Sequence, residues 1–293
     1  MTNQPVAIFG EVLWDTFPDG KKVLGGAPFN VAWHLQAFGL SPVLVSRVGK
    51  DEYGDTILQE MSAWGLSTEG MQIDRRQGTG IVSIDIVDGQ PQYDIEKPKA
   101  YDFIDGGSLP FLPPQCLLYH GTLATRTVSS AMALEAIKTT FTSTIFFDVN
   151  LRAPWWELAK IEACLKTTTW LKLNDEELPL LLPEVTGRDQ QIAFLFERYS
   201  LEYIVFTEGK AGATLFTADG DRHTIQPQTT NTVVDTVGAG DGFCSILLLG
   251  IVRDWPLALT LERAQAFASA IVGIQGATTK DQHFYDTFRN QWV

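Results

Sequence analysis

The chain has 293 residues, of which 45% are hydrophobic and 19% charged, so it can bury a sizeable core as a globular protein. Its 22 basic and 35 acidic residues give a net charge of −13, which argues against nucleic-acid binding and against binding to an anionic membrane surface. A small-molecule partner is favoured instead. Cys116, Cys164 and Cys244 lie far apart and lack metal-ligand spacing, so they are predicted to be core residues of a cytoplasmic protein.

Short β-rich runs alternate along the chain with segments of helical periodicity. The predicted strands cover residues 6–9, 43–48, 116–121, 144–149, 170–174 and 203–207, and helical periodicity is clear at 30–39 and 190–200. This alternation predicts an α/β fold with a mostly parallel sheet covered by helices on both faces. No repeat, linker or membrane-length apolar run interrupts it, so residues 1–293 are expected to form a single domain. Ligands of such a sheet bind beyond the carboxyl ends of its strands.

One region, residues 79–98, departs from the α/β alternation. Val82, Ile84 and Ile86 alternate with polar residues before an Asp-Gly turn at 88–89 and a second extended piece. This pattern predicts a β-hairpin with one apolar face. Such an insertion serves as a lid over the site, as a dimerisation surface, or as both, and the alternative is an edge hairpin without function.

Two polar residues near the N-terminus have the chemistry to bind a polyol. Asp15 follows the first predicted strand in "FGEVLWD", and Asn30 follows the glycines and proline of "GGAPFNVA" on the first turn of a helix. A carboxylate accepts from two donors and an amide both donates and accepts, so together they could hold several hydroxyls. The structural alternatives are a helix-start hydrogen bond for Asn30 and a solvated loop acid for Asp15.

A second glycine-rich stretch, "DTVGAGDGF", lies immediately before an apolar run that predicts a buried helix. The amides of Gly238, Ala239 and Gly240 at such a helix start can form an anion hole. Asp241 beside them could take a proton from a hydroxyl, although an Asp at this position can also simply cap its helix. No Walker A string occurs, and the position of the G-x-G disfavours a dinucleotide-binding dehydrogenase.

"GGAPFNVA" and "DTVGAGDGF" together resemble the two signatures of the PfkB or ribokinase-like family of carbohydrate kinases. "GEVLWD", "FDVNLRAPWW", "LKLNDEEL" and "TEGKAGA" match the family between them and in its order, and the first two look most like the fructokinase branch. The resemblance implies the ribokinase-like α/β sandwich, with a mostly parallel central sheet and a small β-sheet lid. The lid is expected at approximately 12–24 and 80–104.

The resemblance also implies a role for each matching residue. Asp241 resembles the catalytic base, and the amides of Gly238, Ala239 and Gly240 resemble the anion hole. The sugar site is implied at Asp15, Gly26 and Asn30. The ATP site is implied at Asn174, Thr207, Gly209, Gly212 and Thr236, with Glu177 organising magnesium through water and Asp235 beside a monovalent cation. Arg152 is the best cation for the transferred phosphate or an acidic sugar group, a structural ion pair being the alternative, and Lys172 and Lys210 are weaker candidates.

The predicted function is ATP-dependent phosphorylation of a sugar hydroxyl, with ATP, Mg²⁺ and K⁺ as cofactors. Few basic residues occur between Lys97 and Arg126, which favours a neutral ketohexose, fructose first. Ribose, 2-keto-3-deoxygluconate and adenosine are the alternative substrates, and a non-catalytic sugar or nucleotide sensor is the alternative function. A homodimer through the lid is the expected assembly, without a nucleic-acid or membrane partner.

Overall fold

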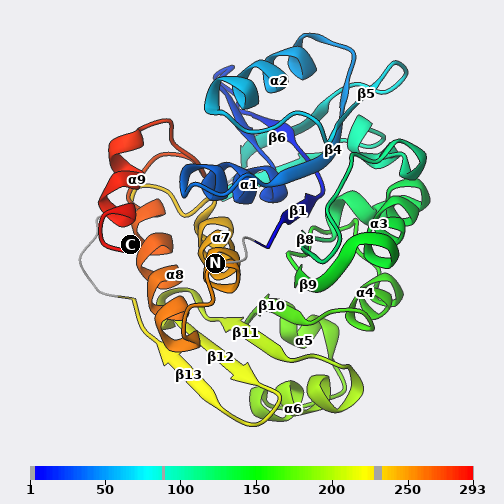
Figure 1. The fold of residues 1–293 in the computed structure, drawn as a ribbon. Helices are drawn as coiled ribbons and strands as arrows, with labels where there is room; N and C mark the ends of the chain where they lie inside the picture. The colour runs from blue at the N-terminus through cyan, green and yellow to red at the C-terminus, as the bar shows by residue number, and fades with distance from the viewer. Residues whose placement is uncertain (1–3, 88–89, 228–232, 293) are drawn as a thin grey trace.

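The computed structural model describes residues 4–87, 90–227 and 233–292. A large central sheet runs through the molecule in the order β13-β12-β11-β10-β9-β8-β1-β4-β5, and a small sheet in the order β3-β2-β6-β7 lies beside it (Figure 1). The strands of the large sheet are β1 (Val6–Phe9), β4 (Val43–Gly49), β5 (Met71–Asp74), β8 (Cys116–His120), β9 (Thr142–Asp148), β10 (Trp170–Asn174), β11 (Tyr203–Thr207), β12 (Ala213–Thr217) and β13 (Arg222–Ile225).

In the large sheet, β5, β4, β1, β8, β9, β10 and β11 are parallel to one another. β12 pairs antiparallel with β11, and β13 pairs antiparallel with β12 at that edge. The prediction of a mostly parallel α/β sheet is therefore confirmed. Because the parallel strands point the same way, the residues that follow β1, β8, β9, β10 and β11 all emerge at one edge of the sheet. The predicted site residues are to be sought at that edge.

Helices cover both faces of the large sheet (Figure 1). Side chains alternate along each strand, so that Ile8 packs with α1, α7 and α8 while Phe9 packs with α3 on the other face. The helices of the first face are α1 (Ala27–Ala37), α2 (Glu52–Trp64), α7 (Ala239–Val252), α8 (Leu257–Ile271) and α9 (Gln282–Arg289), and those of the second are α3 (Val128–Phe141), α4 (Leu158–Leu165), α5 (Glu177–Leu181) and α6 (Arg188–Arg198). Short 3-10 turns are η1 (Ala100–Phe103), η2 (Gly106–Ser108), η3 (Leu123–Arg126) and η4 (Gly209–Ala211).

A small sheet forms from the segments in which the lid is expected. Its strands are β2 (Leu13–Thr16), β3 (Lys22–Gly25), β6 (Gly80–Val87) and β7 (Gln90–Ile95). β6 and β7 pair antiparallel, as the alternating pattern predicts, and Val82 and Ile84 face a buried apolar cluster. The predicted turn at 88–89 and the side chain of Ile86 lie outside the described residues. β2 pairs with β3 and β6, so the lid joins two segments that are distant in the sequence.

The three cysteines are free and buried, as their isolated positions predict. Among the described residues, no helix is both long and apolar enough to cross a membrane.

Candidate active site

The two glycine-rich stretches meet at the N-termini of α1 and α7, which pack against each other. Asn30 lies on the first turn of α1 and Asp241 on the first turn of α7. Although these residues are 211 positions apart in the chain, the Asn30 Nδ2 donates a hydrogen bond of 2.7 Å to Asp241 Oδ2. The side chain of Asn30 therefore supports another polar residue rather than its own helix start.

The start of α7 has the geometry that an anion hole requires. Gly238 is the N-cap with a φ of 79°, and the first i→i−4 bond of the helix is donated by the amide of Gly242 to the carbonyl of Gly238 at 2.8 Å. The amides of Ala239, Gly240 and Asp241 come before that bond and have no i→i−4 partner within the helix. The Ala239 amide makes only a long contact of 3.4 Å with Thr236 O. The N-cap residue of α7 is Gly238, and no side chain caps this helix start. The alternative that Asp241 is a simple helix cap is therefore wrong.

Asp241 is surrounded by charges that tune its carboxylate. Burial raises the pKa of Asp241 to about 6, and the charge of Asp148 adds to this rise. The hydrogen bond from Asn30 and the charges of Arg152 and Lys172 lower it. The carboxylate is therefore largely ionised at neutral pH and remains able to accept a proton.

A buried ion pair lies beneath the start of α7. Lys172 Nζ is 3.0 Å from Asp148 Oδ1, while Asp148 Oδ2 accepts from Tyr119 Oη at 3.1 Å and from Cys244 Sγ at 3.5 Å. A β-carbon at Gly240 would lie 3.8 Å from Lys172 Nζ, which places the ammonium next to the glycine-rich turn. Lys172 was a weak candidate in the sequence, because most lysines are solvated, but here it supplies a fixed positive charge.

The sugar residues predicted at the N-terminus gather at the same place. Gly26 is the N-cap of α1 with a φ of 106°, and a β-carbon there would lie 2.7 Å from Glu11 O. Asp15 lies half-buried on strand β2 of the small sheet, so the alternative of a solvated loop acid is wrong. A β-carbon at Gly25 would lie 2.9 Å from Asp15 Oδ2, so the carboxylate lies over the glycine pair. Burial raises the pKa of Asp15 to about 6.

Arg152 follows β9 and is exposed. Its guanidinium bonds only the neighbouring Leu151 O, at 3.1 Å, and no ion pair of the described residues includes it, so the alternative of a structural pair is not observed. The charge of Arg152 nevertheless lowers the pKa of Asp15 and of Asp241, as well as that of Glu11. One uncompensated cation thus lies within electrostatic reach of three carboxyl groups.

Asn174 and Glu177 at the end of β10 cap α5 reciprocally. Asn174 Oδ1 accepts from the amides of Glu176 and Glu177, at 3.0 and 2.8 Å, and Glu177 Oε2 accepts from the amide of Asn174 at 2.9 Å. Glu177 Oε1 accepts from the amide of Leu151 at 2.9 Å. Burial raises the pKa of Glu177, and the charge of Lys172 lowers it. Both residues are thus held rigidly between β9 and β10.

The remaining predicted nucleotide residues lie on two loops. Thr207 ends β11, Gly209 begins η4, and the amide of Glu208 closes the turn on the carbonyl of Gly212 at 2.8 Å. A β-carbon at Gly212 would lie 2.0 Å from Ile225 O, so only glycine fits there. Lys210, the other weak cationic candidate, belongs to η4 as well.

Asp235 and Thr236 lead into α7 on the second loop. Asp235 Oδ1 accepts from the amide of Val237 and Oδ2 from the amide of Gly276, both at 3.0 Å. Thr236 is exposed. The carboxylate of Asp235 thus ties the start of α7 to the loop after α8.

Two buried charged residues at this edge of the sheet escape the sequence patterns. Glu11 follows β1 and is buried. Burial raises the pKa of Glu11 to about 7, although a hydrogen bond from its own backbone amide and the charges of Arg152 and Arg126 lower that pKa. Arg126 ends η3, after β8, and is also buried. Their positions just beyond parallel strands were the available signal, since polar residues there face the ligand edge of the sheet.

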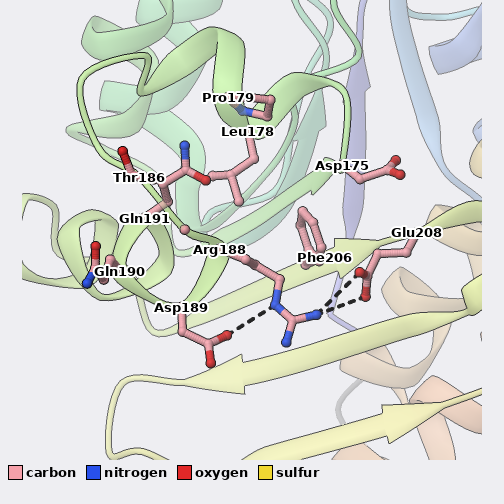
Figure 2. A pocket seen from close by; sticks show the side chains of 11 residues that line it. Asp175, Leu178, Pro179, Thr186, Arg188, Asp189, Gln190, Gln191, Phe206 and Glu208 are labelled. Atoms are coloured by element: carbon pink, nitrogen blue, oxygen red, sulfur yellow. Dashed lines mark hydrogen bonds and ion pairs between the residues drawn. The ribbon is translucent and has the colours of Figure 1, made fainter.

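A hollow of about 600 Å³ lies beside the ends of β10 and β11, between α5, α6 and β11 (Figure 2). Its cation Arg188 is held by Asp189 at 3.1 Å and by Glu208 at 3.3 Å. Asn30, Arg152 and Asp241 do not line it. The reactive groups therefore lie outside this hollow.

A preformed metal cage is absent from the described residues, because no three His, Cys, Asp or Glu side chains among them are grouped as metal ligands. The acidic groups near the nucleotide loops, Glu177 and Asp235, already accept backbone amides. A cation at this site would therefore take most of its ligands from water and from a bound nucleotide.

Comparison with known proteins supports the same interpretation. The family model of the pfkB family carbohydrate kinases matches residues 6–283. The fructokinase of Klebsiella pneumoniae is 28% identical over 302 residues, which cover 94% of this chain and 96% of that protein.

Two solved structures share the fold of the chain. A double mutant of the Vibrio cholerae O395 fructokinase, which holds fructose, ADP and a potassium ion, has a TM-score of 0.83 at 22% identity and 97% coverage of both chains. The aminoimidazole riboside kinase of Salmonella enterica, with aminoimidazole riboside and an ATP analog, has a TM-score of 0.82 at 22% identity, over 97% of this chain and 99% of that one.

Proposed function

The chain belongs to the pfkB family of carbohydrate kinases, and from this premise we propose that it transfers the γ-phosphate of ATP to a hydroxyl of fructose. The single observation that carries the proposal is the 2.7 Å hydrogen bond from Asn30 to Asp241. This bond places the proposed base of one signature against the proposed sugar-binding amide of the other. A proton acceptor and a hydroxyl-binding group in contact are what phosphoryl transfer to an alcohol requires.

In the proposed reaction, Asp241 takes the proton of the attacking hydroxyl. The oxygen of that hydroxyl bonds to the γ-phosphorus, and the bond from the γ-phosphorus to the β–γ bridging oxygen breaks, which leaves ADP. The amides of Gly238, Ala239 and Gly240 donate to the transferred phosphoryl oxygens, and Lys172 and Arg152 add positive charge beside them. The lid strand that carries Asp15 excludes water from competing with the sugar.

ATP is proposed to lie over the turn of Thr207, Gly209 and Gly212, with Asn174 and Thr236 at its sides. Magnesium fits this site as an ion carried largely by phosphate oxygens and water, with Glu177 beside it and no cage of protein ligands. When bound, it would neutralise charge on the phosphates. We propose a potassium ion near Asp235, as the Vibrio cholerae structure holds one.

The balance of charge favours a neutral sugar. Asp15 and Asp241 contribute two carboxyl groups to the proposed sugar site, against the charge of Arg152, while Lys172 is already paired with Asp148. A phosphorylated sugar would need a net cationic cluster. Fructose is proposed first because the Klebsiella pneumoniae relative is a fructokinase. A nucleoside is the alternative that the aminoimidazole riboside kinase structure favours.

The test is ATP consumption by the purified protein across a panel of fructose, glucose, ribose, 2-keto-3-deoxygluconate and adenosine, with magnesium and potassium. We expect ADP release that depends on fructose and that falls by about 10²- to 10⁴-fold in Asp241→Asn, the range for loss of a general base. The variant should keep its fold and its ATP affinity. Near-normal turnover in Asp241→Asn would refute the assignment of the base, and nucleotide or sugar binding without turnover would favour the sensor alternative.

The lid is also proposed as a surface for a homodimer. Among the strands described, β7 pairs only with β6, and Tyr93 on β7 is 52% exposed. Light scattering of the wild-type protein and of Tyr93→Asp tests this, because only a lid dimer would dissociate in the variant.

A further inference from the structure

Buried polar atoms without hydrogen-bond partners are rare in proteins, and each one calls for a physical explanation. In the described part of the chain, three of them lie around the proposed sugar pocket: Asn30 Oδ1, Glu11 Oε2 and Arg126 Nη1. Asn30 already belongs to the proposed site. Glu11 and Arg126 do not, and both are at least nine-tenths buried, with exposed fractions of 5% and 4%.

The guanidinium of Arg126 is fixed on all sides but one. Nε and Nη2 donate to the two oxygens of Asp102, at 2.6 and 2.8 Å, and Nη2 also donates to Glu96 O at 2.7 Å and Tyr101 Oη at 3.0 Å. The rings of Tyr101 and Trp155 lie 5.1 and 4.8 Å from its central carbon. Every nitrogen of a guanidinium is a donor, so the edge that carries Nη1 is oriented and unused.

Glu11 lies at the same edge of the large sheet as Arg126, since each follows one of two adjacent strands. β1 and β8 are adjacent parallel strands with Phe9 opposite His120, so the residues that follow them emerge side by side. The charge of Arg126 acts on the Glu11 carboxyl, and the Glu11 carboxyl in turn acts on Tyr101, whose hydroxyl accepts from Arg126. Glu11 also interacts electrostatically with Asp241 and Arg152. The Glu11 carboxyl therefore lies within electrostatic reach of both Arg126 and the proposed base.

We propose that Glu11 and Arg126 bind one further hydroxyl of the sugar substrate, other than the one that Asp241 deprotonates. A hydroxyl is the complementary ligand for this pair, because it can donate to Glu11 Oε2 while it accepts from Arg126 Nη1. The inference rests on the proposed function and adds a specificity determinant to it. Since Arg126 also bonds Glu96 O at the base of the lid hairpin, a sugar held here would be fixed relative to the lid.

A substrate without this hydroxyl would leave Glu11 Oε2 and Arg126 Nη1 without hydrogen-bond partners in a buried site. Enzymes reject such analogues strongly, whereas they discriminate weakly against a missing methylene group. The pair should therefore select for a hydroxyl at one ring position and be indifferent to the others.

The experiment combines monodeoxy analogues of the best sugar with variants of Glu11. Wild-type protein, Glu11→Ala and Glu11→Gln are assayed with the parent sugar and with each monodeoxy analogue, and KM for ATP is measured in parallel. Glu135→Gln on α3 is the matched control, because that side chain is 56% exposed and pairs only with Lys138 among the ion pairs described. Thermal melting of each variant shows whether it is folded.

The analogue that lacks the phosphorylated hydroxyl cannot react. With one of the other monodeoxy analogues, we expect the kcat/KM of the wild-type protein to fall about 10- to 100-fold, which is the range for a hydrogen bond to a charged group. Glu11→Ala should lose a similar factor with the parent sugar but accept that analogue almost as well as the parent, with KM for ATP unchanged. Equal losses of Glu11→Ala with every analogue, or no loss, would overturn the inference. If the wild-type protein consumed ATP with none of the sugars, the proposed function itself would fail, and this assignment with it.

Arg126 is tested by the same analogues. Arg126→Lys keeps a cation but lacks the Nη1 donor, so it should lose its preference for the parent sugar over the same analogue. Asp102→Asn disturbs the buried pair without removing Nη1 and should keep that preference. If Asp102→Asn lost the preference to the same degree as Arg126→Lys, the contribution of Arg126 would be structural and the donor half of the proposal would be wrong.

Discussion

Asn30 Nδ2 lies 2.7 Å from Asp241 Oδ2, so the starts of two helices far apart in the sequence share one hydrogen bond. The bond fixes the carboxylate in place and stabilises its charged form. In the proposed reaction, this contact links the binding of a hydroxyl to the removal of its proton.

Asn30→Ala should raise the pKa of Asp241 above about 6, because the hydrogen bond from Asn30 lowers that pKa in the native site. The acid limb of the kcat profile should therefore move to higher pH, by roughly half to one unit. Profiles of both proteins between about pH 5 and 8.5 measure this shift. A loss of kcat that is equal at every pH would show that Asn30 acts on the sugar alone.

Activity of the wild-type protein should rise with pH between about 5 and 8. The pKa values of Asp15 and Asp241 are raised to about 6, and the pKa of Glu11 is raised to about 7. Each of these carboxyl groups must lose its proton before it can accept one. Arg152→Gln removes the cation that lowers all three, so its kcat/KM for the sugar should rise only at higher pH. Arg222→Gln, on exposed strand β13, is the control. An unshifted profile would mean that Arg152 contacts only phosphate.

Gly238 and Gly240 should respond differently to alanine. At Gly238, φ is 79° and a β-carbon would lie 2.3 Å from Ala277 Cβ, so Gly238→Ala should destabilise the protein by roughly 1–3 kcal/mol. At Gly240 the nearest described atom is Lys172 Nζ at 3.8 Å, so Gly240→Ala should fold normally. Its methyl group would fill the cradle proposed for phosphate, and kcat/KM for ATP should fall at least about 10-fold.

Chemical denaturation and ATP kinetics of both glycine variants distinguish these effects. A Gly240→Ala protein with normal ATP kinetics would contradict the proposed anion hole.

Lys172→Met should cost about 3–5 kcal/mol of unfolding free energy, because it leaves Asp148 charged and unpaired in the interior. Lys172→Met combined with Asp148→Asn should recover most of that loss. Denaturation of the two single variants and the double variant gives the coupling energy of the pair. Purely additive losses would show that the two side chains act independently.

The local features of the fold could be predicted from sequence. The periodicity of strands and helices depends on neighbouring residues, and so do glycines at turns with positive φ, such as Gly26 and Gly238. The parallel sheet, the β6–β7 hairpin and both glycine-rich helix starts could therefore be predicted from the sequence. The family resemblance placed Asp15 within the expected lid segment 12–24. Its strand pairing was not predictable, because "LWDT" is a short run whose pairing with β3 and β6 arises only in the folded chain.

The sequence by itself determined the elements, the family resemblance and the residues of the two signatures. Only the tertiary structure decided that Glu11 and Arg126 are buried with unused polar atoms, and that Lys172 pairs with Asp148 rather than with solvent. In the sequence these residues look like ordinary surface charges. The physical reason is that burial and hydrogen bonding depend on which distant strands become neighbours, and this information is not contained in any local window of the chain.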